Sequence, residues 1–154
     1  MTGPVDRLAA LGLTLPPVTA PVAAYVPALR TGAYVYVSGQ VPVADGKLLG
    51  TGKVGAEVST EEAAQMARAC ALNGLAAAAS VAGGLDGIRR IVKVVGFVAS
   101  APGFNGQPQV INGASEFLIE VFGEDGRHAR SAIGVAELPL NVPVEVEMIV
   151  EVRD

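Results

Sequence analysis

The chain has 154 residues, of which 51% are hydrophobic and 17% are charged, and its formal net charge is −4. This length is most simply one domain with a sizeable core. No stretch reaches the roughly 20 uninterrupted apolar residues that span a bilayer, so the apolar excess predicts a homo-oligomer rather than a membrane protein. The acidic balance and the scattered basic residues weigh against nucleic acid as the main partner.

The N-terminal half predicts an arm, a strand and a turn. Residues 1–20 are rich in Pro and Ala and are expected to form an arm on the surface of a single domain, residues 21–154. Residues 33–40 are β-branched and aromatic, which predicts a strand. Asp45-Gly46 predicts a hairpin turn, because this pair accepts positive φ, and residues 48–49 would begin the returning strand.

A long helix is expected next. Ser59 and Glu62 fit a capping box, in which each side chain bonds the other residue's backbone N–H. An Ala-rich run over residues 61–82 follows, and Gly83 predicts its end. Cys70 falls on the apolar stripe of this helix, which favours a buried structural thiol over a nucleophile.

A strand and a second helix follow. Residues 88–99 are Val-rich, and Gly96 within them predicts a bulge or a close approach by another group. Pro108 suits the first turn of a helix, and an apolar stripe continues to Val121. The order of strands and helices predicts an α+β or α/β layer with helices on one sheet face. We expect an oligomer to cover the other face.

The last two strands carry most of the candidate chemistry. Glu145 and Glu147 lie on one face of residues 144–152, and the valines lie on the other. The carboxylate face is either open to water or lines an inter-subunit surface, and the sequence leaves both possibilities open.

Arg130 opens the preceding strand, and the residues that share its face are all small. It is either a surface arginine or a residue whose planar guanidinium binds a carboxylate through two parallel hydrogen bonds. A hairpin closing around Leu140 would place Glu145 opposite Val135, about five residues of 3.3 Å rise from Arg130. The two side chains would then meet one ligand only across a subunit boundary, or with a ligand lying along the strand.

Other kinds of site find little support. His128 is the only histidine and, next to a turn, is expected to be exposed rather than catalytic. No metal-ligand cluster and no nucleotide-binding glycine motif is present, and the single cysteine excludes an internal disulfide. The N-terminus lacks the features of a signal peptide, so we expect a cytoplasmic protein.

Four stretches, in order over about residues 25–152, resemble the RidA/YjgF (L-PSP) family of reactive-intermediate deaminases. More narrowly, the chain resembles a divergent subgroup often labelled "putative endoribonuclease". The stretches are Val37-Ser38-Gly39-Gln40-Val41-Pro42, Ala71-Leu72-Asn73-Gly74-Leu75, Val110-Ile111-Asn112, and Ala129-Arg130-Ser131-Ala132 with Leu138-Pro139 and Val144-Glu145-Val146-Glu147.

The resemblance implies a chorismate-mutase-like α+β sheet with two helices on one face, and a homotrimer with clefts between subunits. It also implies a cofactor-free hydrolase of 2-iminobutanoate/2-iminopropanoate type. Such an enzyme converts reactive enamines or imines, such as 2-aminoacrylate, to 2-keto acids and ammonia.

The family's site residues carry over to five positions of this sequence. Arg130 would bind the substrate carboxylate, and Glu145 would hold or activate the attacking water. Tyr25 would line the cleft, and Asn112 and the backbone near Gly39 would shape it. Glu147 is interpreted as structural.

Three departures leave the substrate open. The usual Gly-Pro-Tyr-Ser-Gln segment is here Ala23-Ala24-Tyr25-Val26-Pro27, the loop at residues 103–109 is longer than usual, and Ser115 stands where an aromatic residue is common. The alternatives are a non-catalytic trimer that binds small carboxylates and, more weakly, an endoribonuclease.

Overall fold

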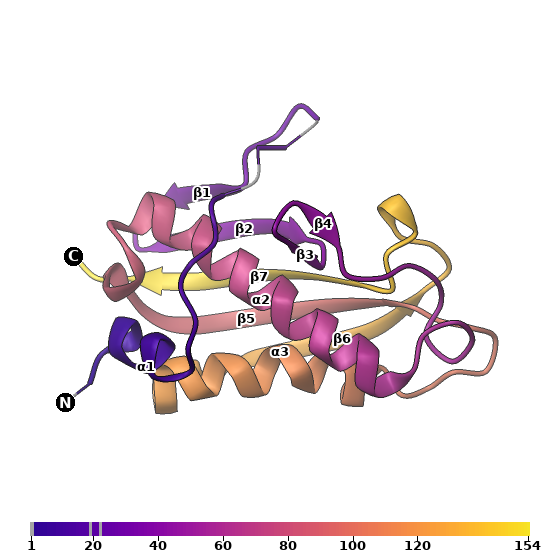
Figure 1. Cartoon of the computed structure of the whole chain (residues 1–154). Coiled ribbons are helices and arrows are strands. Elements are labelled where there is room, and N and C mark those ends of the chain that lie inside the picture. Colours follow the sequence, from indigo (N-terminus) through magenta and orange to yellow (C-terminus); the bar gives the residue numbers. More distant parts are fainter. Residues whose placement is uncertain (1, 19, 22) are drawn as a thin grey trace.

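The computed structural model describes residues 2–18, 20–21 and 23–154. A five-stranded sheet, ordered β1-β2-β7-β5-β6, carries two long helices on one face (Figure 1). The elements are α1 (Pro4–Ala10), β1 (Ala28–Thr31), β2 (Tyr34–Gln40), β3 (Val43–Ala44), β4 (Lys47–Leu48), α2 (Thr60–Ala82), η1 (Leu85–Gly87), β5 (Ile88–Ala99), α3 (Gln107–Phe122), η2 (Gly123–Gly126), β6 (Ala129–Val135), η3 (Pro139–Asn141) and β7 (Val144–Val152).

Helix α2 begins and ends as its sequence predicts. The Ser59 hydroxyl accepts from the Glu62 N–H at 3.1 Å, and the Glu62 carboxylate accepts from the Ser59 N–H at 3.3 Å. Gly83 ends the helix in the left-handed conformation, with φ 79°. Cys70 is fully buried against the sheet, where its thiol lies 3.8 Å from the Val144 carbonyl. The predicted structural thiol is confirmed.

Helix α3 packs on both the sheet and α2. Pro108 lies in its first turn, as predicted, and its buried stripe includes Ile111 and Phe117. Because a side chain at Gly96 would collide with Ile111, this glycine lets α3 approach β5 closely. The predicted close approach at Gly96 is confirmed. The short helix α1 packs against α3 and buries Leu8.

The predicted hairpin between the last two strands is wrong. Strand β5 lies between them, pairing in parallel with β6 and antiparallel with β7. Helix α3 serves as the crossover that places β6 at the edge of the sheet. The chain then returns past β5, through left-handed backbone at Leu140 and Asn141, and inserts β7 beside β2. Glu145 therefore pairs with Phe97 rather than Val135.

The N-terminal strands differ in part from the prediction. The hairpin turn is confirmed, since Asp45 and Gly46 have φ values of 52° and 75°. The strand that returns from it is short, however, and pairs only with β3 in a separate two-stranded sheet. Strand β1 was not predicted, because its four residues are too few to show a clear alternation.

The two faces of the main sheet differ sharply. The valines of β7 are buried under the helices, which confirms the predicted α+β layer. On the other face, one row of paired residues crosses four strands: Leu29, Tyr36, Ile149 and Lys93. Leu29 and Tyr36 in this row are 58% and 49% exposed. No helix among the described residues is long and apolar enough to cross a membrane.

Candidate functional site

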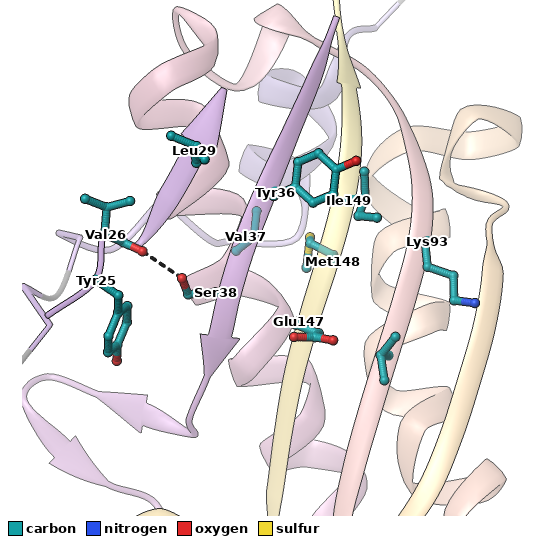
Figure 2. Close-up of a pocket in the computed structure, with 11 residues that line it drawn as sticks. Tyr25, Val26, Leu29, Tyr36, Val37, Ser38, Lys93, Glu147, Met148 and Ile149 are labelled. Carbon is teal, nitrogen blue, oxygen red and sulfur yellow. Dashed lines mark hydrogen bonds between the residues drawn. The ribbon is translucent and has the colours of Figure 1, made fainter. Parts of the chain in front are cut away.

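The open face of the sheet holds a cavity of about 650 Å³. Figure 2 shows Tyr25 and Ser38 on one side of it and Lys93 on the other, with Glu147 between them. The Ser38 hydroxyl donates a 2.7 Å hydrogen bond to the Val26 carbonyl, which holds the segment that carries Tyr25 against the end of β2. The wall is otherwise largely apolar, and its polar groups are few, as in many small-molecule sites.

The Glu145 carboxylate lies on the same open face, farther along β7. It packs against Gly39, where an added Cβ would lie 2.7 Å from Oε1 of Glu145. Burial raises the pKa of Glu145, and the neighbouring Glu147 carboxylate raises it further. Glu147, which the sequence predicts to be structural, lines the cavity, whereas Glu145 is not among the lining residues.

The close contact between Gly39 and Glu145 predicts a selective effect of Gly39→Ala. The new methyl group would displace only the end of a flexible side chain, so stability should change by less than about 1 kcal/mol. The sequence predicts that Glu145 holds or activates the attacking water, so its displacement should lower turnover about tenfold. Steady-state kinetics of Gly39→Ala, of Glu145→Gln and of the double variant test this. If Gly39→Ala slows the Glu145→Gln enzyme as much as it slows the wild type, the effect does not pass through Glu145.

Arg130 lies on the opposite face of the sheet, toward α3. Its register partner is the buried Val94. The guanidinium Nη1 donates to Asn112 Oδ1 at 2.8 Å and to Ser115 Oγ at 3.3 Å. Its Nη2 lies 3.5 Å from the Pro108 carbonyl, at the limit of a hydrogen bond. One nitrogen of the guanidinium is therefore firmly held by α3, and the rest is only weakly engaged.

Four of the five predicted site residues form two groups within one chain, and the fifth, Tyr25, lines the 650 Å³ cavity. Arg130 and Asn112 are in contact, and Glu145 and Gly39 are in contact on the other side of the sheet. Arg130 pairs with Val94, and Glu145 pairs with Phe97. Because Val94 and Phe97 are three residues apart on β5, the side chains of Arg130 and Glu145 point to opposite faces of the sheet. A ligand lying along one strand cannot reach both side chains in one chain.

His128 and Ser115 are the residues that the sequence interpretation placed least well. The His128 ring is half-buried rather than exposed, and both of its nitrogens have hydrogen-bond partners. The predicted exposed ring is wrong, because α3 packs over the turn that carries it. Asn112 and Ser115 are three apart on one helix, which places both on the same face toward Arg130. That spacing was visible in the sequence.

Neither a cysteine nucleophile nor a metal site finds support in the described part of the chain. Burial raises the pKa of the Cys70 thiol, chiefly by desolvation, and so opposes formation of a nucleophilic thiolate. Across residues 2–18, 20–21 and 23–154, no group of three His, Cys, Asp or Glu side chains could hold a metal ion.

Comparison with known proteins places the fold in a family. Residues 5–152 match the family described as "YjgF/chorismate_mutase-like, putative endoribonuclease". Protein TCP17 of Trypanosoma cruzi is 43% identical over 149 residues, which cover 96% of this chain and 93% of that protein.

Two solved structures are also similar. The Agrobacterium tumefaciens protein Atu1372, of unknown function, is 48% identical with a TM-score of 0.88, covering 97% of this chain and 94% of the other. E. coli TdcF with bound serine is 25% identical with a TM-score of 0.62, covering 89% and 94%. The chain belongs to the YjgF family.

Proposed function

We propose that the protein is a cofactor-free deaminase that hydrolyses small imino or enamino acids, such as 2-aminoacrylate, to 2-keto acids and ammonia. The observation that carries the proposal is the held guanidinium of Arg130. Asn112 and Ser115 fix its Nη1, while Nη2 has one weak contact. A planar fork that is fixed on one side and accessible on the other suits a carboxylate.

The proposed active unit is a homotrimer with its sites in clefts between subunits. Arg130 and Glu145 face opposite sides of one sheet, so a site that uses both needs two chains. The open face carries exposed Leu29 and Tyr36, apolar surface of the kind that subunits cover. In this arrangement Arg130 of one subunit would face Glu145, Gly39 and Tyr25 of the next.

The proposed chemistry needs one base. Arg130 and Asn112 would anchor the substrate carboxylate beside Glu145. The Glu145 carboxylate would accept a proton from water as the water oxygen bonds to the C=N carbon. The substrate nitrogen would take that proton, which gives a carbinolamine. Glu145 would then transfer the carbinolamine hydroxyl proton to the same nitrogen as the C–N bond breaks and the C=O bond forms, releasing ammonia. An enamine substrate would react as its imine tautomer. Imine hydrolysis is intrinsically easy, so positioning and one base, contributing about 10²–10⁴-fold, suffice.

A relative supports the substrate class. TdcF of E. coli has been solved with serine bound. Serine is a small amino acid with a free carboxylate, the group that Arg130 is proposed to bind here. Membership of the same family makes a small carboxylate the first ligand to test.

The proposal predicts that the purified protein accelerates keto-acid release from enzymatically generated 2-aminoacrylate, and that Arg130→Ala lowers kcat/KM about 10²-fold. Two charge-assisted hydrogen bonds of about 1.5 kcal/mol each account for that factor. Arg130→Lys should also be impaired, because an ammonium lacks the planar pair of N–H donors that binds both carboxylate oxygens. The assay should cover several imino acids.

Sedimentation of each variant controls for assembly, since wild type and variants should show three times the chain mass. Unchanged activity in an intact Arg130→Ala oligomer would refute the assigned role. Saturable binding of keto acids without turnover of any imine would instead favour the non-catalytic alternative.

A further inference from the structure

A second cavity, of about 220 Å³, lies on the helix side of β6, apart from the cavity on the open face. Its lining residues are Ser115, Ile119, Arg127, His128 and Arg130. Ser115 is 9% exposed, and it is the only polar or charged side chain in the buried class among the described residues. Polar side chains at such a depth need hydrogen-bond partners, and the partners of Ser115 are informative.

The direction of each hydrogen bond at this site is fixed by chemistry. His128 Nδ1 lies 2.6 Å from the Gly126 carbonyl, which can only accept, so Nδ1 carries the hydrogen. Burial lowers the pKa of His128, and the ring is therefore neutral near pH 7. Its Nε2 then holds a lone pair, and the Ser115 hydroxyl, 2.9 Å away, donates to it.

With its hydrogen directed at His128, the Ser115 oxygen presents its lone pairs to Arg130. It accepts from Nη1 at 3.3 Å, and Asn112 Oδ1 accepts from the same nitrogen at 2.8 Å. The result is a chain of hydrogen bonds with one direction, from Arg130 through Ser115 and His128 to the Gly126 carbonyl. A neutral His128 with the other tautomer could not complete this chain.

We propose that Ser115 and His128 are positioning residues for Arg130 and hold its guanidinium in the orientation that binds the substrate carboxylate. This inference rests on the proposed function of Arg130. An arginine side chain left free would have to be ordered at each binding event, at a cost in affinity.

The test measures binding of 2-oxobutanoate by calorimetry. Ser115→Ala should weaken binding about tenfold, the loss expected for one hydrogen bond to a charged group of about 1.5 kcal/mol. His128→Phe should weaken it similarly, whereas Ser115→Thr, which keeps the hydroxyl, should stay within about twofold. Ser80→Ala is the matched control, because Ser80 bonds only the Ala77 carbonyl within α2. In the deaminase assay, the effect should fall on KM more than on kcat.

A second measurement uses the fact that His128 is the only histidine. Its ¹⁵N NMR spectrum should show the tautomer with hydrogen on Nδ1, and adding 2-oxobutanoate should shift the Nε2 signal in the wild type but not in Ser115→Ala. The inference is overturned if the other tautomer is found, or if Ser115→Ala binds as the wild type does while Arg130→Ala does not bind.

Failure of the proposed function would give a different pattern. If the wild type binds no keto acid, or if Arg130→Ala binds as well as the wild type, the assigned role of Arg130 fails. The hydrogen-bond chain is then judged by the histidine tautomer and by rotation of the Arg130 guanidinium. The guanidinium should rotate faster in Ser115→Ala than in the wild type. An unchanged rotation rate would refute the proposed chain of hydrogen bonds as well.

Discussion

Glu145→Gln is expected to lower kcat for imine hydrolysis by about 10²-fold or more, the usual contribution of a general base. Glutamine keeps the shape of the side chain and its packing against Gly39, but it cannot accept a proton at neutral pH. The substrate carboxylate is proposed to bind at Arg130, so KM should change little. Initial-rate measurements on the assembled protein separate the two constants.

The pH dependence gives the same residue a second test. Burial and the Glu147 carboxylate both raise the pKa of Glu145. A base works only when deprotonated, so kcat should be highest above this raised pKa and should fall as the pH drops through it. Glu147→Gln removes a like charge and should move this acid limb to lower pH while leaving the maximal rate largely intact.

Glu147→Gln is therefore the matched control, since it makes the same chemical change two residues away on the same strand face. Equal losses of kcat in Glu145→Gln and Glu147→Gln would contradict the assignment of Glu145 as the base. A large loss in Glu147→Gln alone would transfer the role to the carboxylate that lines the 650 Å³ cavity.

The parts of the fold that could be predicted are those with local causes. Ser59 and Glu62 bond each other's backbone, so their spacing alone predicts where α2 begins. Asp45 and Gly46 adopt positive φ for reasons internal to the pair. Gly96 marked a close approach, and the structure identifies Ile111 as its neighbour.

The order of the strands could not be predicted in the same way. The last two strands are separated by one short loop, which favours a hairpin locally. Strand β5, which ends 45 residues before β7 begins, lies between them and pairs with both. This non-local pairing moves Glu145 beside Phe97 and places strand β5 between Glu145 and the strand that carries Arg130. The need for two chains in the proposed site is clearer as a result.

In the candidate site, too, features with local causes could be predicted and features that depend on non-local packing could not. Arg130 and Asn112 were predicted site residues, and the structure brings them into contact at 2.8 Å. The contribution of His128 was not predictable, because its position beside a turn suggested exposure. Only the packing of α3 against β6 brings Ser115 within 2.9 Å of its ring.

Gly113→Ala is expected to destabilise the protein by about 3 kcal/mol, the upper part of the range for overpacking. The usual expectation is the reverse, since replacing glycine by alanine inside a helix stabilises it by about 1 kcal/mol. Here an added Cβ would collide with the backbone carbonyl of Ala64 in α2. Backbone cannot move aside as a side chain can, so the two helices would have to separate.

Gly74→Ala provides the matched comparison within α2. An added Cβ there would lie 2.6 Å from Cε of Met148, the end of a flexible side chain. Methionine adapts its rotamer readily, so the gain in helix propensity should offset most of the strain and leave stability within about 1 kcal/mol. Urea unfolding at one fixed chain concentration should show a much lower midpoint for Gly113→Ala than for Gly74→Ala. Equal midpoints would mean that the α2–α3 crossing at Gly113 is not a rigid backbone contact.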